Sequence, residues 1–122
     1  MNTYYIEVDN AGVVIPTLNE EGNIEYLLRN ILDRYANIKI VVVDDQSQDL
    51  TVSIVQELGK KFPNSIYLIA REEKINGLAG AYIEGYQHCL SLGLAWIFQM
   101  DADGQHDPKD MLQMEPTGEW DE

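Results

Sequence analysis

Short apolar runs alternate along this chain with stretches in which apolar residues recur every three or four positions. An apolar run bounded by turn residues predicts a buried strand, and the wider spacing predicts a helix with one apolar face. Strands are predicted at 11–15, 38–43, 66–70 and 94–100, and helices at about 20–35, 50–60 and 77–92. Because the two kinds of element alternate, we predict an α/β fold with a parallel sheet and right-handed crossovers.

The predicted boundaries of these elements depend on a few residues in the connecting loops. Pro16 is expected to end the first strand, since proline cannot donate a hydrogen bond to a neighbouring strand. Asn19 and Asp49 are expected to cap the first and second helices through their side chains. These residues place polar loops directly after the first two strands.

Two carboxylates, Asp101 and Asp103, follow the last predicted strand at a spacing of two. If extended geometry continues past that strand, both side chains point to the same side. Converging carboxylates repel each other unless a positive charge lies between them, and Mg²⁺ or Mn²⁺ prefers such oxygen ligands. Gln105, the next position on the same alternation, can add a neutral oxygen. We therefore predict a metal or phosphate site here, and the alternative is an ordinary polar turn.

Polar residues also follow the other predicted strands, at the edge of the sheet where open α/β folds bind ligands. Asp44 and Asp45 close the second strand, where an acidic residue can hold ribose hydroxyls; the alternative is a helix-capping turn. Arg71 and Lys74 follow the third strand, and they either neutralise phosphate or are solvated at the surface. Gly77 and Gly80 can bring a helix N-terminus close to a phosphate, although close packing explains them equally well.

Composition narrows the class of protein. The 122 residues suffice for one modest domain, and a hydrophobic content of 45% supports a packed core. A formal net charge of -13 argues against nucleic acid or an anionic membrane surface as the main partner. A single cysteine, Cys89, cannot form an internal disulfide, so a reducing, cytoplasmic setting is expected. No Gly-x-Gly-x-x-Gly follows the first strand, which disfavours a dinucleotide oxidoreductase.

Four segments of the chain, in this order, resemble those of family 2 glycosyltransferases. They are 14–24 (VIPTLNEEGNI), 42–51 (VVDDQSQDLT), 77–81 (GLAGA) and 100–108 (MDADGQHDP). The branch that they resemble most is that of the polyprenyl (dolichyl) phosphate mannosyltransferases and related polyprenyl-phosphate glucosyltransferases. The resemblance covers about 11–114 of a single nucleotide-sugar-binding domain, 1–122, in which 115–122 is an atypical tail.

The resemblance implies a Rossmann-like GT-A fold, with helices on both faces of a mostly parallel sheet, that binds a nucleotide-sugar and Mg²⁺ or Mn²⁺. It implies that the nucleotide pocket is formed by Pro16, Asn19, Glu20, Asp44 or Asp45, Arg71, Gly77, Gly80 and Asp101. It implies that the metal is held by Asp101, Asp103 and Gln105. The implied reaction transfers a sugar, mannose or glucose, from a GDP- or UDP-sugar to a polyprenyl phosphate with inversion, so a peripheral position at the membrane face is expected.

The chain departs from the family pattern in several respects. Gln46 stands where the family commonly has glycine, and Gly104 stands where the mannosyltransferases often have leucine. The family domain also extends further, so we expect a truncated domain whose catalytic residues lie in the missing C-terminal half. One alternative is an inactive fragment that binds nucleotide and self-associates as a homodimer through an open sheet edge. A remote alternative is a phosphoacceptor switch, which requires an aspartate after the third strand, where Arg71 stands.

Overall fold

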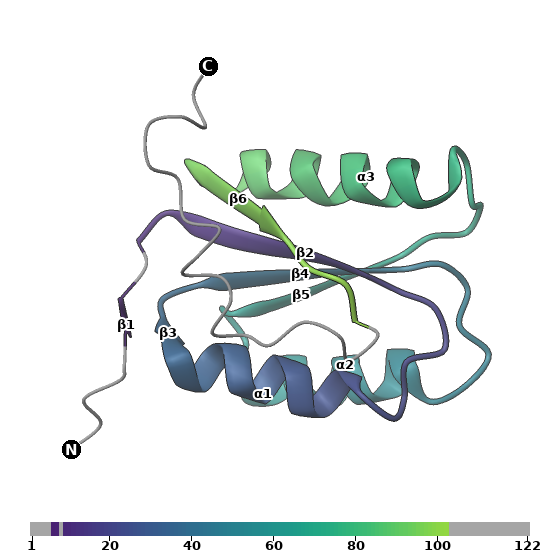
Figure 1. Ribbon diagram of the computed structural model, residues 1–122, viewed down its shortest axis with the longest axis horizontal. Coiled ribbons are helices and arrows are strands. Elements are labelled where there is room, and N and C mark those ends of the chain that lie inside the picture. Colours follow the sequence, from purple (N-terminus) through teal and green to yellow (C-terminus); the bar gives the residue numbers. More distant parts are fainter. Residues whose placement is uncertain (1–5, 8, 103–122) are drawn as a thin grey trace.

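A four-stranded sheet forms the centre of the molecule (Figure 1). This computed structural model describes residues 6–7 and 9–102. The strands are β2 (Ala11–Thr17), β4 (Lys39–Asp44), β5 (Ile66–Ala70) and β6 (Trp96–Gln99), in the spatial order β5-β4-β2-β6. All their pairings are parallel, which confirms the predicted α/β class. The chain builds outward from β2 to β5 and then returns to place β6 beside β2, and such a switch leaves a crevice at the carboxyl ends of the strands.

Helices cover both faces of the sheet. α1 (Ile24–Arg34) and α2 (Thr51–Lys61) lie on one face, and α3 (Gly77–Ser91) lies on the other (Figure 1). Ile15 of β2 is buried in the layer with α1 and α2, and its neighbour Val14 is buried against α3. Successive residues of the strand therefore point to opposite layers, as a strand that is buried on both faces requires.

α3 comes close to β2 because glycine stands at the points of contact. A Cβ atom on Gly85 would lie 2.3 Å from Cγ1 of Val14, which is closer than two carbon atoms can approach. A Cβ atom on Gly12 of β2 would lie 2.7 Å from Cδ1 of Leu94, in the segment that follows α3. The absence of side chains at Gly85 and Gly12 thus sets the distance between the helix and the central strand.

β2 continues through Pro16, so the prediction that this proline ends the strand is wrong. The register pairs Pro16 with Val43 and Thr17 with Asp44. Backbone groups of residues two apart point to the same neighbouring strand, so Pro16, like Val14, faces β6. Pairing with β6 stops at Val14, and no carbonyl therefore needs an N–H from the proline. β2 and β6 are no longer paired beyond Val14, so the sheet is open between their carboxyl ends.

The first helix begins at Ile24 rather than at residue 20, and Asn19 does not cap it. The N-cap is Asn23, which makes no side-chain cap hydrogen bond. Asn19 instead has a φ of 55°, and its side chain accepts a hydrogen bond from the backbone N–H of Gln48. The expected cap is therefore wrong because a contact distant in sequence takes up the Asn19 side chain.

The second helix begins at Thr51, one residue later than predicted, and Asp49 supports its first turn. Oδ1 of Asp49 accepts hydrogen bonds from the N–H of Thr51 at 2.9 Å and from its hydroxyl at 2.5 Å. The N-cap position itself is Leu50, which makes no side-chain cap hydrogen bond. Asp49 thus hydrogen-bonds the first residue of the helix from the position before the N-cap.

The last strand, β6, is shorter than the predicted 94–100, since it pairs with β2 only over 96–99.

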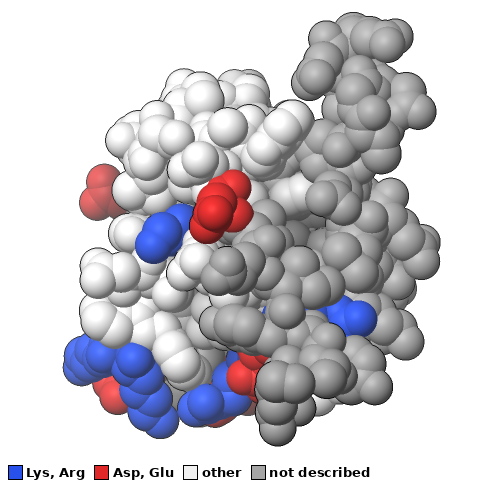
Figure 2. Space-filling view, turned by 90° about the vertical axis from the view of Figure 1, so that its left-hand side faces the viewer, with Lys and Arg blue, Asp and Glu red and all other residues white. Residues whose placement is uncertain are grey.

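A short parallel pair, β1 (Ile6–Glu7) with β3 (Tyr35–Ala36), lies beside the amino ends of the main strands. Figure 2 views this side of the molecule and shows Lys and Arg side chains gathered over the layer of α1 and α2. Arg34, Lys60 and Lys61 lie in the last turns of these helices, where the helix dipole favours cations. These cations lie far from the carboxyl ends of the strands.

Within the described residues, no helix has both the length and the apolar composition that crossing a membrane requires.

Candidate functional site

A cavity of about 450 Å³ opens at the carboxyl ends of β2, β4 and β6, beside the first turn of α3. Its volume is within the range of small-molecule sites, and it lies at the switch point of the strand order, where open α/β sheets bind ligands. The residues that line it are Pro16, Thr17, Leu18, Glu20, Asp45, Lys74, Gly77, Leu78, Asp101 and Ala102.

The cavity brings together five of the predicted site residues, from four separate segments of the chain. These are Pro16, Glu20, Asp45, Gly77 and Asp101. Four others are absent from the lining and make contacts behind it: Asn19, Asp44, Arg71 and Gly80. The remaining two predicted metal ligands, Asp103 and Gln105, lie outside the described residues.

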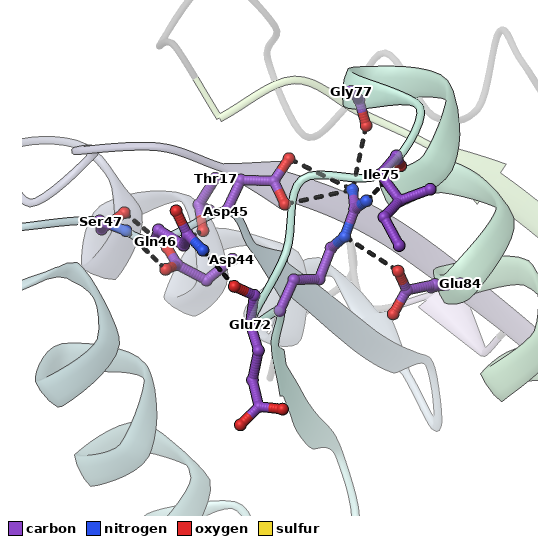
Figure 3. A network of polar contacts seen from close by, with 10 residues as sticks. Thr17, Asp44, Asp45, Gln46, Ser47, Glu72, Ile75, Gly77 and Glu84 are labelled. Carbon is purple, nitrogen blue, oxygen red and sulfur yellow. Dashed lines mark hydrogen bonds and ion pairs between the residues drawn. The ribbon is translucent and has the colours of Figure 1, made fainter.

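The two adjacent aspartates at the end of β4 have different surroundings (Figure 3). Asp44 is buried, and its Oδ1 accepts hydrogen bonds from the hydroxyls of Thr17 at 2.6 Å and Ser47 at 2.5 Å. Its Oδ2 accepts a third hydrogen bond, from the N–H of Ser47 at 2.9 Å. Asp44 therefore joins the ends of β2 and β4, whereas Asp45 lines the cavity.

Asn19 joins the loops that follow β2 and β4. Its Oδ1 accepts a hydrogen bond from the N–H of Gln48 at 2.8 Å, and its own N–H donates to Oγ of Ser47, also at 2.8 Å. The N–H of the next residue, Glu20, donates to Oγ1 of Thr51 at 2.8 Å. These hydrogen bonds hold Glu20 beside the cavity, and Asn19 itself points away from it, towards the second loop.

Arg71 is buried, so the interpretation as a solvated surface residue is wrong. Its side chain is 1% exposed, with Nη1 3.1 Å from Oδ1 of Asp45 and Nε 2.9 Å from Oε2 of Glu84. The guanidinium also donates to the carbonyl of Gly77 at 3.0 Å and to that of Ile75 (Figure 3). Two carboxylates and two carbonyls thus compensate for the burial of this cation. Arg71 holds Asp45 in place and presents no charge of its own to the cavity.

Gly80 lies where the network around Arg71 leaves no space for a side chain. A Cβ atom there would lie 2.0 Å from the carbonyl oxygen of Ile75 and 3.0 Å from Nη2 of Arg71. Close packing therefore explains Gly80. Gly77 differs, because it lines the cavity with a φ of 54° as the first residue of α3. The positive end of the α3 dipole consequently lies at the cavity wall.

Asp101 reaches the cavity from the segment that follows β6, where the hydroxyl of Tyr82 in α3 donates a hydrogen bond to its Oδ1 at 3.0 Å. Among the described residues, the lining has the carboxylates of Glu20, Asp45 and Asp101 and one ammonium group, that of Lys74. The lining therefore has more carboxylates than ammonium groups, and Arg71 behind it compensates Asp45. The carboxylates of Glu20 and Asp101 favour a diphosphate that binds together with a cation.

Of the predicted metal ligands, Asp101 lies among the described residues, and its carboxylate suits a hard divalent metal ion. Mg²⁺ is often bound by one or two carboxylates together with substrate phosphates and water, and it needs no complete protein cage. Within the described residues, no three His, Cys, Asp or Glu side chains gather closely enough to hold a metal ion. The residues therefore fit a metal that would share its coordination between Asp101 and a bound diphosphate.

Four cavity residues have no role in the sequence-based prediction: Thr17, Leu18, Leu78 and Ala102. Leu18 and Leu78 are largely exposed, and an apolar residue in a loop or on a helix face gives no pattern that marks a site. Tyr82, which hydrogen-bonds Asp101, also has no role in the sequence-based prediction, and its spacing of four from Tyr86 on the helix is the signal that could have drawn attention to it.

A smaller hollow of about 280 Å³ lies between α1 and α2, away from the carboxyl ends of the strands. It is lined by Glu25, Leu50, Ser53, Ile54, Glu57, Leu58 and Lys61. None of the predicted site residues contributes to it.

Comparison with known proteins identifies close relatives of the chain. The family model described as Glycosyl transferase family 2 matches residues 12–115. Polyprenol monophosphomannose synthase of Mycolicibacterium smegmatis is 33% identical over 102 residues, which are 84% of this chain and 38% of that protein. Dolichol-phosphate mannosyltransferase of Pyrococcus furiosus is 40% identical over 101 residues, which are 81% of this chain and 27% of that protein. The chain thus spans less than half the length of these relatives.

Solved structures share the fold of this chain. The mannosyltransferase PcManGT from Pyrobaculum calidifontis, solved with GDP-Man and Mn²⁺, matches with a TM-score of 0.67 and 30% identity over 90% of this chain and 31% of that chain. TarS of S. aureus matches with a TM-score of 0.62 and 24% identity over 85% of this chain and 30% of that chain. The expected Rossmann-like GT-A architecture is confirmed. Since the family model covers most of the sequence, this chain belongs to glycosyl transferase family 2.

Proposed function

We propose that this chain binds a nucleoside diphosphate sugar together with a divalent metal in the cavity at the strand ends. It would then act as the donor-binding part of a glycosyltransferase. The donor in this proposal is GDP-mannose, and the acceptor is a polyprenyl phosphate, with inversion at the sugar carbon as the family resemblance implies. The observation that carries the proposal is that Asp45, Gly77 and Asp101, from three different segments, line one cavity of about 450 Å³.

Each of these residues suits a different part of the donor. Asp45 is an acceptor held in place by Arg71, so it suits the donor groups of a base or of ribose hydroxyls. The N–H groups at the start of α3, beside Gly77, suit a phosphate. Asp101 suits a metal that bridges the diphosphate. When bound, that metal supplies a Lewis acid that stabilises the negative charge on the departing nucleotide.

The similar proteins favour mannose over other sugars. The two relatives named above are a polyprenol monophosphomannose synthase and a dolichol-phosphate mannosyltransferase. PcManGT, at 30% identity, was solved with GDP-Man and Mn²⁺. These names support a guanosine donor, a mannosyl group and a polyprenyl phosphate acceptor. The carboxylates of Glu20 and Asp101 in the lining also favour a diphosphate that binds together with a metal.

Calorimetric titration of GDP and UDP, each with Mn²⁺ and with EDTA, tests this proposal. We expect GDP to bind with Mn²⁺ and to bind about tenfold or more weakly with EDTA, and UDP to bind more weakly than GDP. Asp101→Asn should weaken the binding of GDP with Mn²⁺ by about tenfold or more, since a contact to a charged group contributes about 1.5–3 kcal/mol. Asp33→Asn makes the same chemical change on an exposed part of α1 and should leave binding unchanged.

Absence of GDP and UDP binding by a chain with intact circular dichroism would overturn the proposal. Tighter binding of UDP than of GDP would support the proposed site but would indicate a uridine donor in place of a guanosine donor. Transfer is measured separately, with radiolabelled GDP-mannose and dolichyl phosphate in detergent. Metal-dependent binding without any transfer would favour the alternative, a fragment that binds nucleotide and does not turn over.

A further inference from the structure

Two tyrosines one turn apart on α3 each contact the end of β6 or the residues just after it. The hydroxyl of Tyr82 donates to Oδ1 of Asp101 at 3.0 Å, and the hydroxyl of Tyr86 donates to Oε1 of Gln99. The two rings are stacked, with centroids 6.0 Å apart and planes inclined at 26°. Residues four apart on a helix are separated by about the same distance as residues two apart on an extended chain. Each tyrosine can therefore hydrogen-bond one of the two residues, Gln99 and Asp101.

Asp101 lies just beyond the part of the chain that the sheet holds. β6 pairs with β2 only as far as Gln99, which lies opposite Val14. One further backbone hydrogen bond, from the N–H of Met100 to the carbonyl of Val14 at 3.1 Å, is the last before Asp101. Asp101 itself is exposed. Its backbone is thus not fixed by strand pairing, and its carboxylate depends on a side-chain contact for its direction.

We propose that Tyr82 is a positioning residue that orients the Asp101 carboxylate towards a metal-bound nucleoside diphosphate, an inference that rests on the function proposed above. The phenol occupies one lone pair of Oδ1, which leaves Oδ2 and the remaining lone pair of Oδ1 for a metal ion. A carboxylate that is already oriented loses less conformational freedom when the ligand binds, and the affinity is higher for that reason. Tyr82 would act through Asp101, without touching the ligand itself.

The substitution Tyr82→Phe removes the hydroxyl and keeps the ring that stacks on Tyr86. We expect it to weaken the binding of GDP in the presence of Mn²⁺ by about three- to tenfold, the range that corresponds to the cost of ordering one further side chain when the ligand binds. Tyr86→Phe is the matched control, because it removes the same group from the same helix face, one turn away, at a bond to Gln99. We expect it to change the affinity by less than about twofold.

A double-mutant cycle separates a positioning role from a structural one. If Tyr82 acts through Asp101, then Tyr82→Phe should have no further effect on GDP affinity in an Asp101→Asn background. Independent, additive losses in the cycle would overturn the inference, as would equal losses from Tyr82→Phe and Tyr86→Phe, because both results point to general loosening of α3. An unchanged affinity in Tyr82→Phe would overturn it and leave the proposed function standing. Failure of the unsubstituted chain to bind GDP would overturn the proposed function, and this inference with it.

Discussion

Replacement of Arg71 by methionine tests whether a buried cation holds the cavity wall together. Methionine keeps much of the apolar stem and removes the guanidinium. The substitution leaves Oδ1 of Asp45, 3.1 Å from Nη1, without its cation, and it removes the guanidinium donor from the carbonyls of Ile75 and Gly77. The Arg71 side chain is 1% exposed, so water has little access to these groups unless the loop between β5 and α3 opens.

The expected loss of stability follows from the exposure of each partner. Removal of one member of a buried ion pair costs about 3–5 kcal/mol, because the other charge stays buried. The side chain of Glu84 is 42% exposed, so its carboxylate regains water and adds little to the cost. The side chain of Asp45 is 13% exposed and accounts for most of it. We therefore expect Arg71→Met to lower the free energy of unfolding by about 3 kcal/mol.

Urea unfolding followed by circular dichroism measures this change. The matched control is Arg29→Met, since Arg29 pairs with Glu25 across one turn of α1, and the two side chains are 40% and 53% exposed. Exposed pairs of this kind contribute about 0.3–0.5 kcal/mol. The reasoning would be refuted if Arg71→Met were no more destabilising than Arg29→Met, because the network around Arg71 would then not hold the loop.

Three further predictions concern packing and ionisation. Gly85→Ala should lower the free energy of unfolding by about 1–3 kcal/mol, because its Cβ would lie 2.3 Å from Cγ1 of Val14. Gly59→Ala, also in a helix but with no atom nearer than 3.8 Å to its Cβ, should raise it by about 0.5–1 kcal/mol, and urea unfolding that gives both the same sign contradicts this account. Burial raises the pKa of Asp49, but hydrogen bonds donated to its carboxylate outweigh this and leave the pKa below its ordinary value. A lowered pKa stabilises the fold above the pKa of the unfolded state, about 3.9, and the effect is lost as the pH falls through the folded value. The difference in stability between the unsubstituted chain and Asp49→Asn should thus be constant near neutral pH and shrink below about pH 4, whereas a difference that grows on acidification would be inconsistent with it. Burial raises the pKa of Cys89 to about 11, so at pH 8 this thiol should react with DTNB about a hundredfold more slowly in the folded chain than in urea; equal rates would show that it is not buried.

The sheet and its helices could be predicted because their signals are local. The apolar runs at β2 and β4 and the helical spacing of residues such as Leu28 in α1 depend only on near neighbours in sequence. The start of α1 could not be predicted in the same way. The side chain of Asn19 accepts a hydrogen bond from Gln48, 29 residues away, and no local pattern shows that this contact replaces a helix cap.

The candidate site was predictable as a region and not in its detail. Adjacent residues of a strand point to opposite sides, so the sequence places one of Asp44 and Asp45 in the cavity without showing which. The side chains of Thr17 and Ser47 decide this, because they hydrogen-bond Asp44. Arg71 is harder still to predict, because its burial depends on partners that come together only when β4, β5 and α3 are assembled.

The central claim, that the cavity at the strand ends binds a nucleoside diphosphate, is tested most directly by NMR. Amide shifts of the ¹⁵N-labelled chain would be followed while GDP and Mg²⁺ are added. The account predicts that the largest shifts fall on Leu18, Asp45, Gly77 and Asp101, which lie around the cavity. The largest shifts falling instead at the hollow between α1 and α2, or no shifts at all in a folded chain, would contradict it.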